Sequence, residues 1–524
     1  MRKRKFQPFS IALVAMLWLA TCETTTRTLA GPKIDRRALV TRHNVVLTNA
    51  DPRTPLQVGN GEFAFSVDIT GLQTFLPANT MSHWGWHTAP LPKQLHLEDF
   101  KLELYDTYGR QVGYPTSAKG QEALFQWLRQ NPHRFNLGKL SLWAKKLDGT
   151  DATLSDIVQP RQELDLWRGL ISSRYTIEGA PVEVLTCCHP ARDMVAVQIR
   201  SPLLSTARIG VLLAFPYASP TNSGADWSRP DAHSTSVRNF GPNRVDIARK
   251  LDADMYFVAL GWDSAAELHQ LDQHTFLLKP RIGSRKLRLV CLFSPRRITG
   301  ELPNFDQVRK AAASHWARFW NAGGAIDLSG SSDPRWRELE RRIVLSQYLM
   351  AIQAAGSLPP QESGLVNNSY HWNGKFHLEM HWWHGVHFAL WGRWHLFERS
   401  LDWYRQILPQ ARQLARSQGY RGARWPKMVG PDGRDSPSGI GPLLIWQQPH
   451  PIYYALLDYR LHPTRQTLEK WREIVFETAE FMASYAVLDK ETGRFVLGPP
   501  LKTVPENTDP RTTRNPAFEL SYWR

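Results

Sequence analysis

The chain has 524 residues, enough for about three domains of average size or two large ones. Hydrophobic residues make up 42% and charged residues 21%, a globular balance that argues against a disordered protein. The net charge is +16, but basic residues beyond the N-terminus are scattered among acidic ones, so we expect no nucleic-acid partner.

Residues 1–30 predict an export signal. A basic run is followed by the apolar stretch Phe9–Ala20, which is too short to span a bilayer comfortably and suits the core of a signal peptide. The segment Leu19–Cys22 resembles a bacterial lipobox, which makes Cys22 a candidate lipid anchor, and cleavage after Ala30 is the alternative. No later segment looks transmembrane. We therefore expect a periplasmic or secreted protein, or an outer-membrane lipoprotein.

Residues 31–300 predict an antiparallel β-sandwich. In "GNGEFAFSVDITG", Phe63, Phe65, Val67 and Ile69 recur at every second position between glycine turns, as in a strand. Similar runs follow, and "EGAP" suits a hairpin connection between two of them. Many short strands with frequent Gly and Pro are typical of a large sandwich.

The cysteines indicate neither a disulfide framework nor a zinc site. Beyond Cys22 the chain holds Cys187, Cys188 and Cys291, with no C-x-x-C spacing. We expect Cys187 and Cys188 to lie on opposite faces of one strand as small apolar side chains.

Near residue 301 the spacing of apolar residues changes from the two-residue period of strands to the period of a helix. Residues 301–334 predict a helical linker, and residues 335–524 predict a helical catalytic domain with long loops rich in Gly and Pro. Long loops between core helices usually carry function. At the end of the chain, Asn515 is a good N-cap and Pro516 a good first residue for a last helix.

The densest chemistry lies in "SYHWNGKFHLEMHWWHGVHF". Four histidines follow helical spacing, but a zinc protease needs H-E-x-x-H, and Glu379 stands in the wrong place for that pattern. We therefore expect no metal and no cofactor. The better interpretation is a sugar pocket, because Trp stacks on sugar faces while His, Asn, Lys and Glu hydrogen-bond hydroxyl groups.

Two further loops, "GARWPK" and "IWQQPH", repeat this mixture of aromatic and polar residues. The candidate sugar-binding residues are Trp372, Asn373, Lys375, His377, His381, Trp425, Lys427, Gln447, Gln448 and His450. Glu506 follows Pro505 in the last loop, and a rigid loop can hold a carboxyl group at the angle that a general acid needs. The alternative for Glu506 is a loop salt bridge with Arg511 or Arg514.

These motifs resemble two known enzyme families. "GSLPPQESGLVNNSYHWNGKFHLEMHWWH" resembles the start of the catalytic domain of family-95 glycoside hydrolases, the α-1,2-fucosidases, although Lys375 and His377 stand where that family has two catalytic asparagines. "GARWPK" and "IWQQPHPIYYALLDYR" look like family-65 maltose and kojibiose phosphorylases. "VGNGEFAFSVDITGLQTF" is similar to the strand that opens the sandwich in both families. The resemblance covers nearly the whole chain, in order.

The resemblance implies a β-sandwich, a helical linker and an (α/α)6 toroid of six helical hairpins. Residues 335–524 have room for about half of such a toroid, so we expect a truncated one. The Pro505-Glu506-Asn507 segment matches the loop that carries the general acid in this superfamily.

The implied function is an exported glycoside hydrolase that acts by inversion on an oligo- or polysaccharide. Glu506 is the expected acid, and the base is either Glu379 or a residue beyond Arg524. Two alternatives stay open: a phosphate-dependent disaccharide phosphorylase, and a non-catalytic glycan-binding protein.

Overall fold

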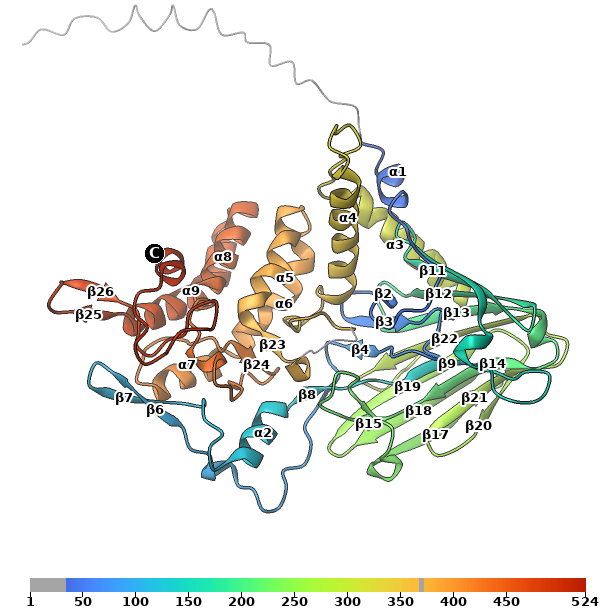
Figure 1. Ribbon diagram of the computed structural model, residues 1–524, viewed down its shortest axis with the longest axis horizontal. Helices are drawn as coiled ribbons and strands as arrows, with labels where there is room; N and C mark the ends of the chain where they lie inside the picture. The colour runs from blue at the N-terminus through green and yellow to red at the C-terminus, as the bar shows by residue number, and fades with distance from the viewer. Residues whose placement is uncertain (1–33, 367–371) are drawn as a thin grey trace, which may run out of the picture.

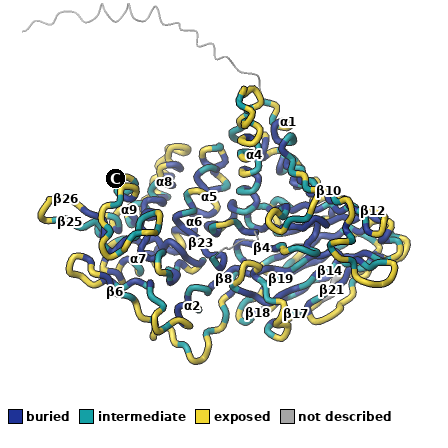
Figure 2. The backbone as a smooth tube through the Cα atoms, viewed as in Figure 1, coloured by how far each residue is buried: buried dark blue, intermediate teal, exposed yellow. Residues whose placement is uncertain are grey.

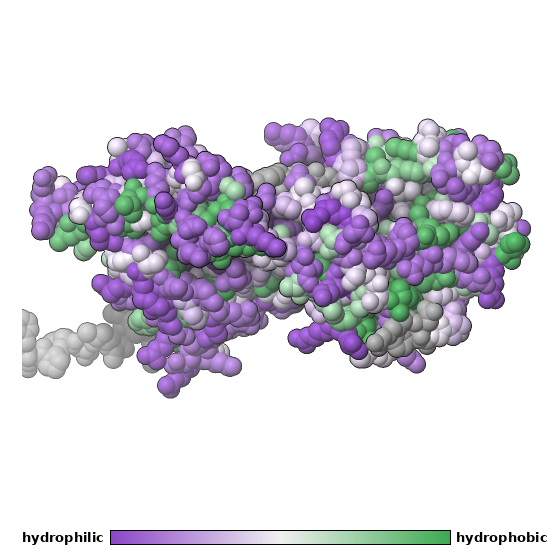
Figure 3. Space-filling view, turned by 90° about the horizontal axis from the view of Figure 1, so that it is seen from below, coloured by the Kyte–Doolittle hydropathy of each residue, from purple (hydrophilic) through white to green (hydrophobic). Residues whose placement is uncertain are grey.

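A computed structural model describes residues 34–366 and 372–524 (Figure 1). The predicted export signal and Cys22 lie outside the described residues. Within the described part, a β-rich lobe and a helical lobe lie side by side, and a waist separates them when the molecule is seen from below (Figure 3). No helix of the described segments is long and apolar enough to cross a membrane.

The β-rich lobe is built around a nine-stranded antiparallel sheet. Across the sheet its strands are β1 (Val45–Leu47), β10 (Val158–Asp165), β11 (Leu170–Ile177), β12 (Ala180–Cys188), β13 (Met194–Arg200), β22 (Lys286–Ser294), β19 (Asp254–Trp262), β18 (Arg244–Leu251) and β17 (His233–Gly241). A four-stranded sheet consists of β20 (Ala266–Gln270), β21 (Thr275–Pro280), β14 (Ile209–Ala214) and β9 (Lys139–Ala144). Buried side chains of both sheets form one apolar core, so these strands make a sandwich.

Smaller β elements complete this lobe. A three-stranded sheet contains β2 (Leu56–Gly59), β3 (Phe63–Val67) and β4 (Thr80–Ser82), and a short pair joins β15 (Tyr217–Ala218) to β16 (Ala225–Asp226). All five residues of β3 are buried, including the alternating Phe63, Phe65 and Val67.

Two details of the predicted strands are confirmed. The "EGAP" segment connects β11 to β12, and Glu178 and Gly179 both have positive φ angles of 47° and 76°, as a two-residue hairpin turn requires. Cys187 packs in the cluster under helix α3, whereas Cys188 faces the core between the sheets. The two cysteines therefore lie on opposite faces of β12.

Three helices border the sandwich. Helix α1 (Arg36–Thr41) contacts α3 (Phe305–Asn321), which covers the nine-stranded sheet with Phe305, Val308 and Ala312. Helix α4 (Trp336–Gln353) lies over β2 and β3, and its buried residues belong to the sandwich core. Helix α3 lies within the predicted linker, residues 301–334, and the division of the chain into these domains stays a prediction.

The helical lobe contains α5 (Leu378–Leu390), α6 (Trp394–Gln406), α7 (Leu408–Ser417), α8 (His450–Leu461), α9 (Arg465–Tyr485) and α10 (Ala517–Trp523). Helix α5 packs on α6, α8 packs on α9, and α5 also contacts α8. Short strand pairs join β23 (Phe376–His377) to β24 (Met428–Val429) and β25 (Val487–Asp489) to β26 (Arg494–Val496). The interior of this lobe is buried, including most of the long loop between α7 and α8, whereas the β25–β26 hairpin is largely exposed (Figure 2).

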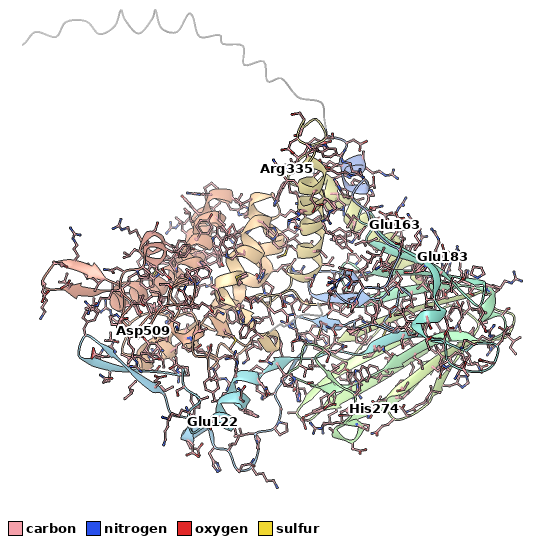
Figure 4. All side chains as sticks on the ribbon, in the orientation of Figure 1. Glu122, Glu163, Glu183, His274, Arg335 and Asp509 are labelled. Carbon is pink, nitrogen blue, oxygen red and sulfur yellow. The ribbon has the colours of Figure 1, made fainter. Side chains whose placement is uncertain are left out.

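The β-rich lobe sends an arm, residues 88–132, beneath the helical lobe (Figure 1). The arm lies between β5 (Trp86–His87) and β8 (His133–Arg134) and holds β6 (Glu103–Thr107), β7 (Arg110–Tyr114) and α2 (Glu122–Gln130). The Tyr108 hydroxyl donates to the Gly498 carbonyl at 2.8 Å, and Arg511 pairs with Glu103 at 2.7 Å. Figure 4 shows Glu122 on the arm and Asp509 in the loop above the β6–β7 hairpin.

The start of α10 differs from the sequence-based prediction. The prediction of Asn515 as N-cap is wrong, because its side chain accepts the Leu497 N–H at 2.8 Å, while Pro516 takes the cap position. Asn515 has a φ of 47° and joins α10 to the segment that follows β26. The side chain of Asn515 therefore anchors the last loop instead of starting the helix.

Candidate active site

Three predicted residues converge between the loops of the helical lobe. The Lys427 Nζ lies 3.0 Å from Glu379 Oε1 and 3.8 Å from Glu506 Oε1. Glu379 stands in the first turn of α5, and Lys427 directly precedes β24. The pairing of β24 with β23, just before α5, brings Lys427 to Glu379, and the loop before α10 supplies Glu506.

Buried polar atoms without partners gather at the same place. His377 is fully buried, and its Nδ1 lies 3.4 Å from Glu379 Oε1 and 3.4 Å from Glu362 Oε2. These approaches are not aligned hydrogen bonds, so among the residues that the structure describes neither ring nitrogen of His377 nor the Glu379 Oε2 has a hydrogen-bond partner. Buried polar groups are nearly always paired, so this cluster indicates a place where hydroxyl groups of a ligand can bind.

The charge state of Glu379 follows from its surroundings. Burial alone would raise the pKa of this carboxyl group, but His377 and Lys427 together outweigh burial and hold the pKa below its ordinary value. Glu379 is therefore ionised at neutral pH. It can accept a hydrogen bond from a hydroxyl group, and as long as Lys427 stays beside it, it is a weak base.

The backbone is strained at three of the predicted residues. Trp372, Asn373 and Glu506 have φ angles of 51°, 61° and 61°, a left-handed region in which bulky non-glycine residues are rare. For Trp and Glu this conformation costs about 1 kcal/mol or more, and such outliers concentrate at active sites. The Glu506 N–H donates to the Thr503 carbonyl at 2.8 Å, which closes the turn that aims the Glu506 side chain.

Trp372 joins the site to the arm. Its ring centre lies 5.6 Å from that of His377, and the Lys427 Nζ lies 5.7 Å from the Trp372 ring centre. The guanidinium of Arg129, on α2, lies 5.3 Å from the same ring centre. Sequence reasoning did not find Arg129 or Glu362, because nothing in the local pattern places either beside residues 372–379.

Two other predicted residues connect the site to the β-rich lobe. The Asn373 side-chain amide donates to the Pro220 carbonyl at 2.7 Å, and the Lys375 Nζ donates to the Asn131 carbonyl at 2.8 Å. Burial, aided by the nearby Arg434, lowers the pKa of Lys375 to about 7. Lys375 is therefore not a permanent positive charge at neutral pH, and its hydrogen bond points to the arm.

Five of the predicted sugar-binding residues lie inside the helical lobe instead: His381, Trp425, Gln447, Gln448 and His450. His381 meets the Tyr404 hydroxyl at 3.1 Å and the Ser400 hydroxyl at 3.0 Å, which ties α5 to α6.

The other four are bonded within the lobe in the same way. The side-chain amides of Gln447 and Gln448 donate to the Trp425 carbonyl at 3.1 and 2.7 Å, and the Trp425 indole donates to Thr478 at 3.0 Å. The His450 ring contacts the main chain of Glu379. These contacts tie the five residues into the lobe, and of their polar atoms the Gln447 Oε1 is buried without a partner among the described residues.

The remaining histidines of α5 have separate partners. The His384 Nε2 meets the Glu362 carbonyl and the His387 Nε2 meets the His384 carbonyl, both at 2.9 Å. Among the residues that the structure describes, no group of three or more His, Cys, Asp or Glu side chains is arranged to hold a metal ion.

Comparison with known proteins gives a distant relationship in sequence. No protein-family profile matches the chain. Proteins named as an uncharacterized glycosyl hydrolase from two strains of Mycobacterium tuberculosis are 25% identical to it over 365 residues. The match covers 65% of this chain and 26% of theirs, so the chain spans about a quarter of the length of these relatives.

The fold has known counterparts. A protein of the human microbiome provisionally named as a kojibiose phosphorylase matches with a TM-score of 0.67 at 10% identity, over 92% of this chain and 64% of its own. A bacterial glucoamylase solved with acarbose matches with a TM-score of 0.45 at 8% identity, over 84% of this chain and 62% of its own. The first match shows that the chain shares the fold of the phosphorylase.

Proposed function

We propose that the chain belongs to an exported glycoside hydrolase that cleaves an oligo- or polysaccharide by inversion, with Glu506 as the general acid. The observation that carries this proposal is the convergence of Glu506 with the buried Glu379–Lys427 pair and the unpaired nitrogens of His377. The Glu506 side chain is 38% exposed, so a glycosidic oxygen can reach it from solvent while the sugar ring enters the buried polar cluster.

The reaction needs a proton donor on one side of the glycosidic bond and an activated water on the other. Because Lys427 Nζ lies 3.0 and 3.8 Å from Glu379 Oε1 and Glu506 Oε1, these two oxygens are at most 6.8 Å apart, the sum of the two distances. Inverting enzymes space the carboxyl groups by roughly 6.5–9.5 Å, with the water between them, so this upper bound reaches only the lower end of that range. If Glu379 is the base, Lys427 must move aside when substrate and water enter.

Otherwise Glu379 binds a sugar hydroxyl group, and a carboxylate elsewhere in the whole protein activates the water. The shared fold with a protein named as a phosphorylase, and the distant relatives named as glycosyl hydrolases, support a carbohydrate substrate. The resemblance to family 95 and the toroid layout remain part of the proposal.

A phosphorylase is the second candidate. Arg129 and Lys427 both lie close to the Trp372 ring, so an incoming phosphate would meet two cations beside the sugar site. In that reaction phosphate takes the place of the activated water.

Incubation of the whole protein with a panel of plant and host oligosaccharides, with and without inorganic phosphate, tests both candidates. Free reducing sugar formed without phosphate supports the hydrolase. Sugar 1-phosphate formed only when phosphate is present supports the phosphorylase. Binding of a glycan without turnover in either condition would contradict both and leave a glycan-binding protein.

A further inference from the structure

Helix α10 is linked to the main chain beside both candidate carboxylates. The link to the Glu506 loop is direct, and the link to Glu379 runs through His450. Glu519 and Tyr522 are three residues apart, so their side chains leave the helix on the same face. The adjoining side of α10 carries Leu520 and Trp523, which pack on the apolar cluster around Tyr485.

The first link runs from Glu519 to the Glu506 loop. Glu519 is 1% exposed, and its Oε1 accepts the Val504 N–H at 3.0 Å, two residues before Glu506. Its Oε2 is buried, with no hydrogen-bond partner in the described part of the chain. A carboxyl group that is buried almost completely and bonded to one loop N–H fixes the position of that loop.

The second link runs from Tyr522 to Glu379 through His450. The His450 Nδ1 lies 2.8 Å from the Tyr522 hydroxyl, and its Nε2 lies 3.1 Å from the Glu379 carbonyl oxygen. Burial lowers the pKa of His450 to about 4, so the ring is neutral at pH 7 and carries one proton. A carbonyl oxygen can only accept, so that proton is on Nε2, and the Tyr522 hydroxyl donates to Nδ1.

We propose that α10 is the positioning element of this site, with Glu519 holding the Glu506 loop and Tyr522 holding the first turn of α5 at Glu379 through His450. The inference rests on the proposed glycoside hydrolase function. One short helix thereby sets the placement of the two carboxylates relative to each other. Neither Glu519 nor Tyr522 contacts substrate in this account; both act through other residues.

The two links predict different kinetic signatures. Glu519→Leu frees the Glu506 loop, so the proton donor is misplaced and kcat on an unactivated disaccharide should fall about 10–100-fold. An aryl glycoside with a 4-nitrophenol leaving group needs little protonation and should lose much less. Glu519→Gln keeps an oxygen that accepts the Val504 N–H and should retain most of the activity.

Tyr522→Phe should instead lower kcat on both substrates by a similar factor, because it acts through Glu379. Ser521→Ala is the matched control, since Ser521 lies on the same helix and is exposed. The control should leave the ratio of the two substrates unchanged.

Hydrogen-exchange mass spectrometry separates this inference from the proposed function, because it needs no substrate. Glu519→Leu should raise amide exchange in residues 500–510, while Glu519→Gln and Ser521→Ala should not. Unchanged exchange in that loop, or an equal loss of kcat on both substrates in Glu519→Leu, would overturn the positioning role. If the wild-type chain cleaves no glycoside, the proposed function fails, and the exchange result still decides the role of α10.

Discussion

Replacing Lys427 by Met tests the charge pairing at the centre of the site. The Lys427 and Glu379 side chains are 11% and 6% exposed, and their charged atoms lie 3.0 Å apart. Removing one member of a buried ion pair leaves the other charge uncompensated, which usually costs about 3–5 kcal/mol. The Lys427 side chain keeps some exposure to solvent, so we expect a loss near the lower end, about 3 kcal/mol at pH 7.

The loss should depend on pH, and its sign follows from the pKa of Glu379. In the native protein this pKa is held below its ordinary value, so Glu379 contributes stability above pH ~4.3, and that stability is lost as the pH falls through the native pKa. Without Lys427, only His377 opposes the effect of burial, so the pKa of Glu379 moves upward. The penalty of the variant then grows as the pH rises from 4 to 7.

Urea unfolding followed by tryptophan fluorescence at pH 4.5 and pH 7 measures both effects. The exposed Lys490→Met is the matched control and should change the free energy of unfolding by less than about 0.5 kcal/mol. The double variant Lys427→Met/Glu379→Gln should recover much of the loss at pH 7, because no buried charge remains. A loss below about 0.5 kcal/mol at pH 7, or an equal loss at both pH values, would refute the reasoning.

Other predictions address the arm, the backbone and export. Arg129→Ala should raise KM about tenfold with little change in kcat, since its guanidinium lies beside Trp372 at the edge of the site; an unchanged KM would remove the arm from substrate binding. Gly374→Ala should cost about 1–3 kcal/mol in urea unfolding, because a Cβ there would lie 2.3 Å from the Arg134 Cβ, whereas Gly493→Ala, with a similar φ and open space, should cost only about 1 kcal/mol. N-terminal sequencing of protein from the native host should find residues 1–21 or 1–30 removed, with labelled palmitate on Cys22 only in the first case; intact Met1 would contradict export. Elemental analysis should find no stoichiometric metal, and one zinc per chain lost in His377→Ala would revive a metal site.

The strands could be predicted because alternation and turn chemistry are local. Cys187 and Cys188 lie on opposite faces of β12 for the simple reason that successive side chains of a strand alternate. Glu178 and Gly179 form the expected turn between β11 and β12. The arm could not be foreseen, because its contacts join residues such as Tyr108 and Gly498, which lie far apart in the chain.

The sequence could name candidate side chains for the site but not where they point. The type of a residue indicates which chemistry it can perform, whereas tertiary packing decides which way its side chain faces. His377 and His381 are four residues apart and of one type. His377 ends a short strand and points its unpaired ring at Glu379 and Glu362, whereas His381 lies inside α5 and is bonded to Tyr404 and Ser400. Only tertiary packing distinguishes them.

The same dependence on tertiary packing explains why some residues expected to bind sugar are bonded within the lobe, and why other residues near the site were missed. Gln448 was expected to bind a sugar, yet its amide bonds the main chain of Trp425 at both ends, since its Oε1 accepts the Trp425 N–H at 2.9 Å. Glu519, in a short helix that reads as apolar packing, was overlooked because its function depends on the Val504 N–H, which no sequence pattern places beside it.

The central claim is that Glu506 donates the proton to the leaving group. Its most direct test is the ratio of kcat/KM for an unactivated disaccharide to that for the matching 4-nitrophenyl glycoside, measured for the full chain and for Glu506→Gln, with Asp509→Asn in the same exposed loop as control. Glu506→Gln keeps the shape and removes the proton donor, so kcat/KM on the disaccharide should fall about 10²–10⁴-fold and fall much less on the aryl glycoside. The control should behave like the wild type on both. Nearly normal rates of Glu506→Gln on both substrates would contradict the account and leave Glu506 as a partner of Lys427 in the loop.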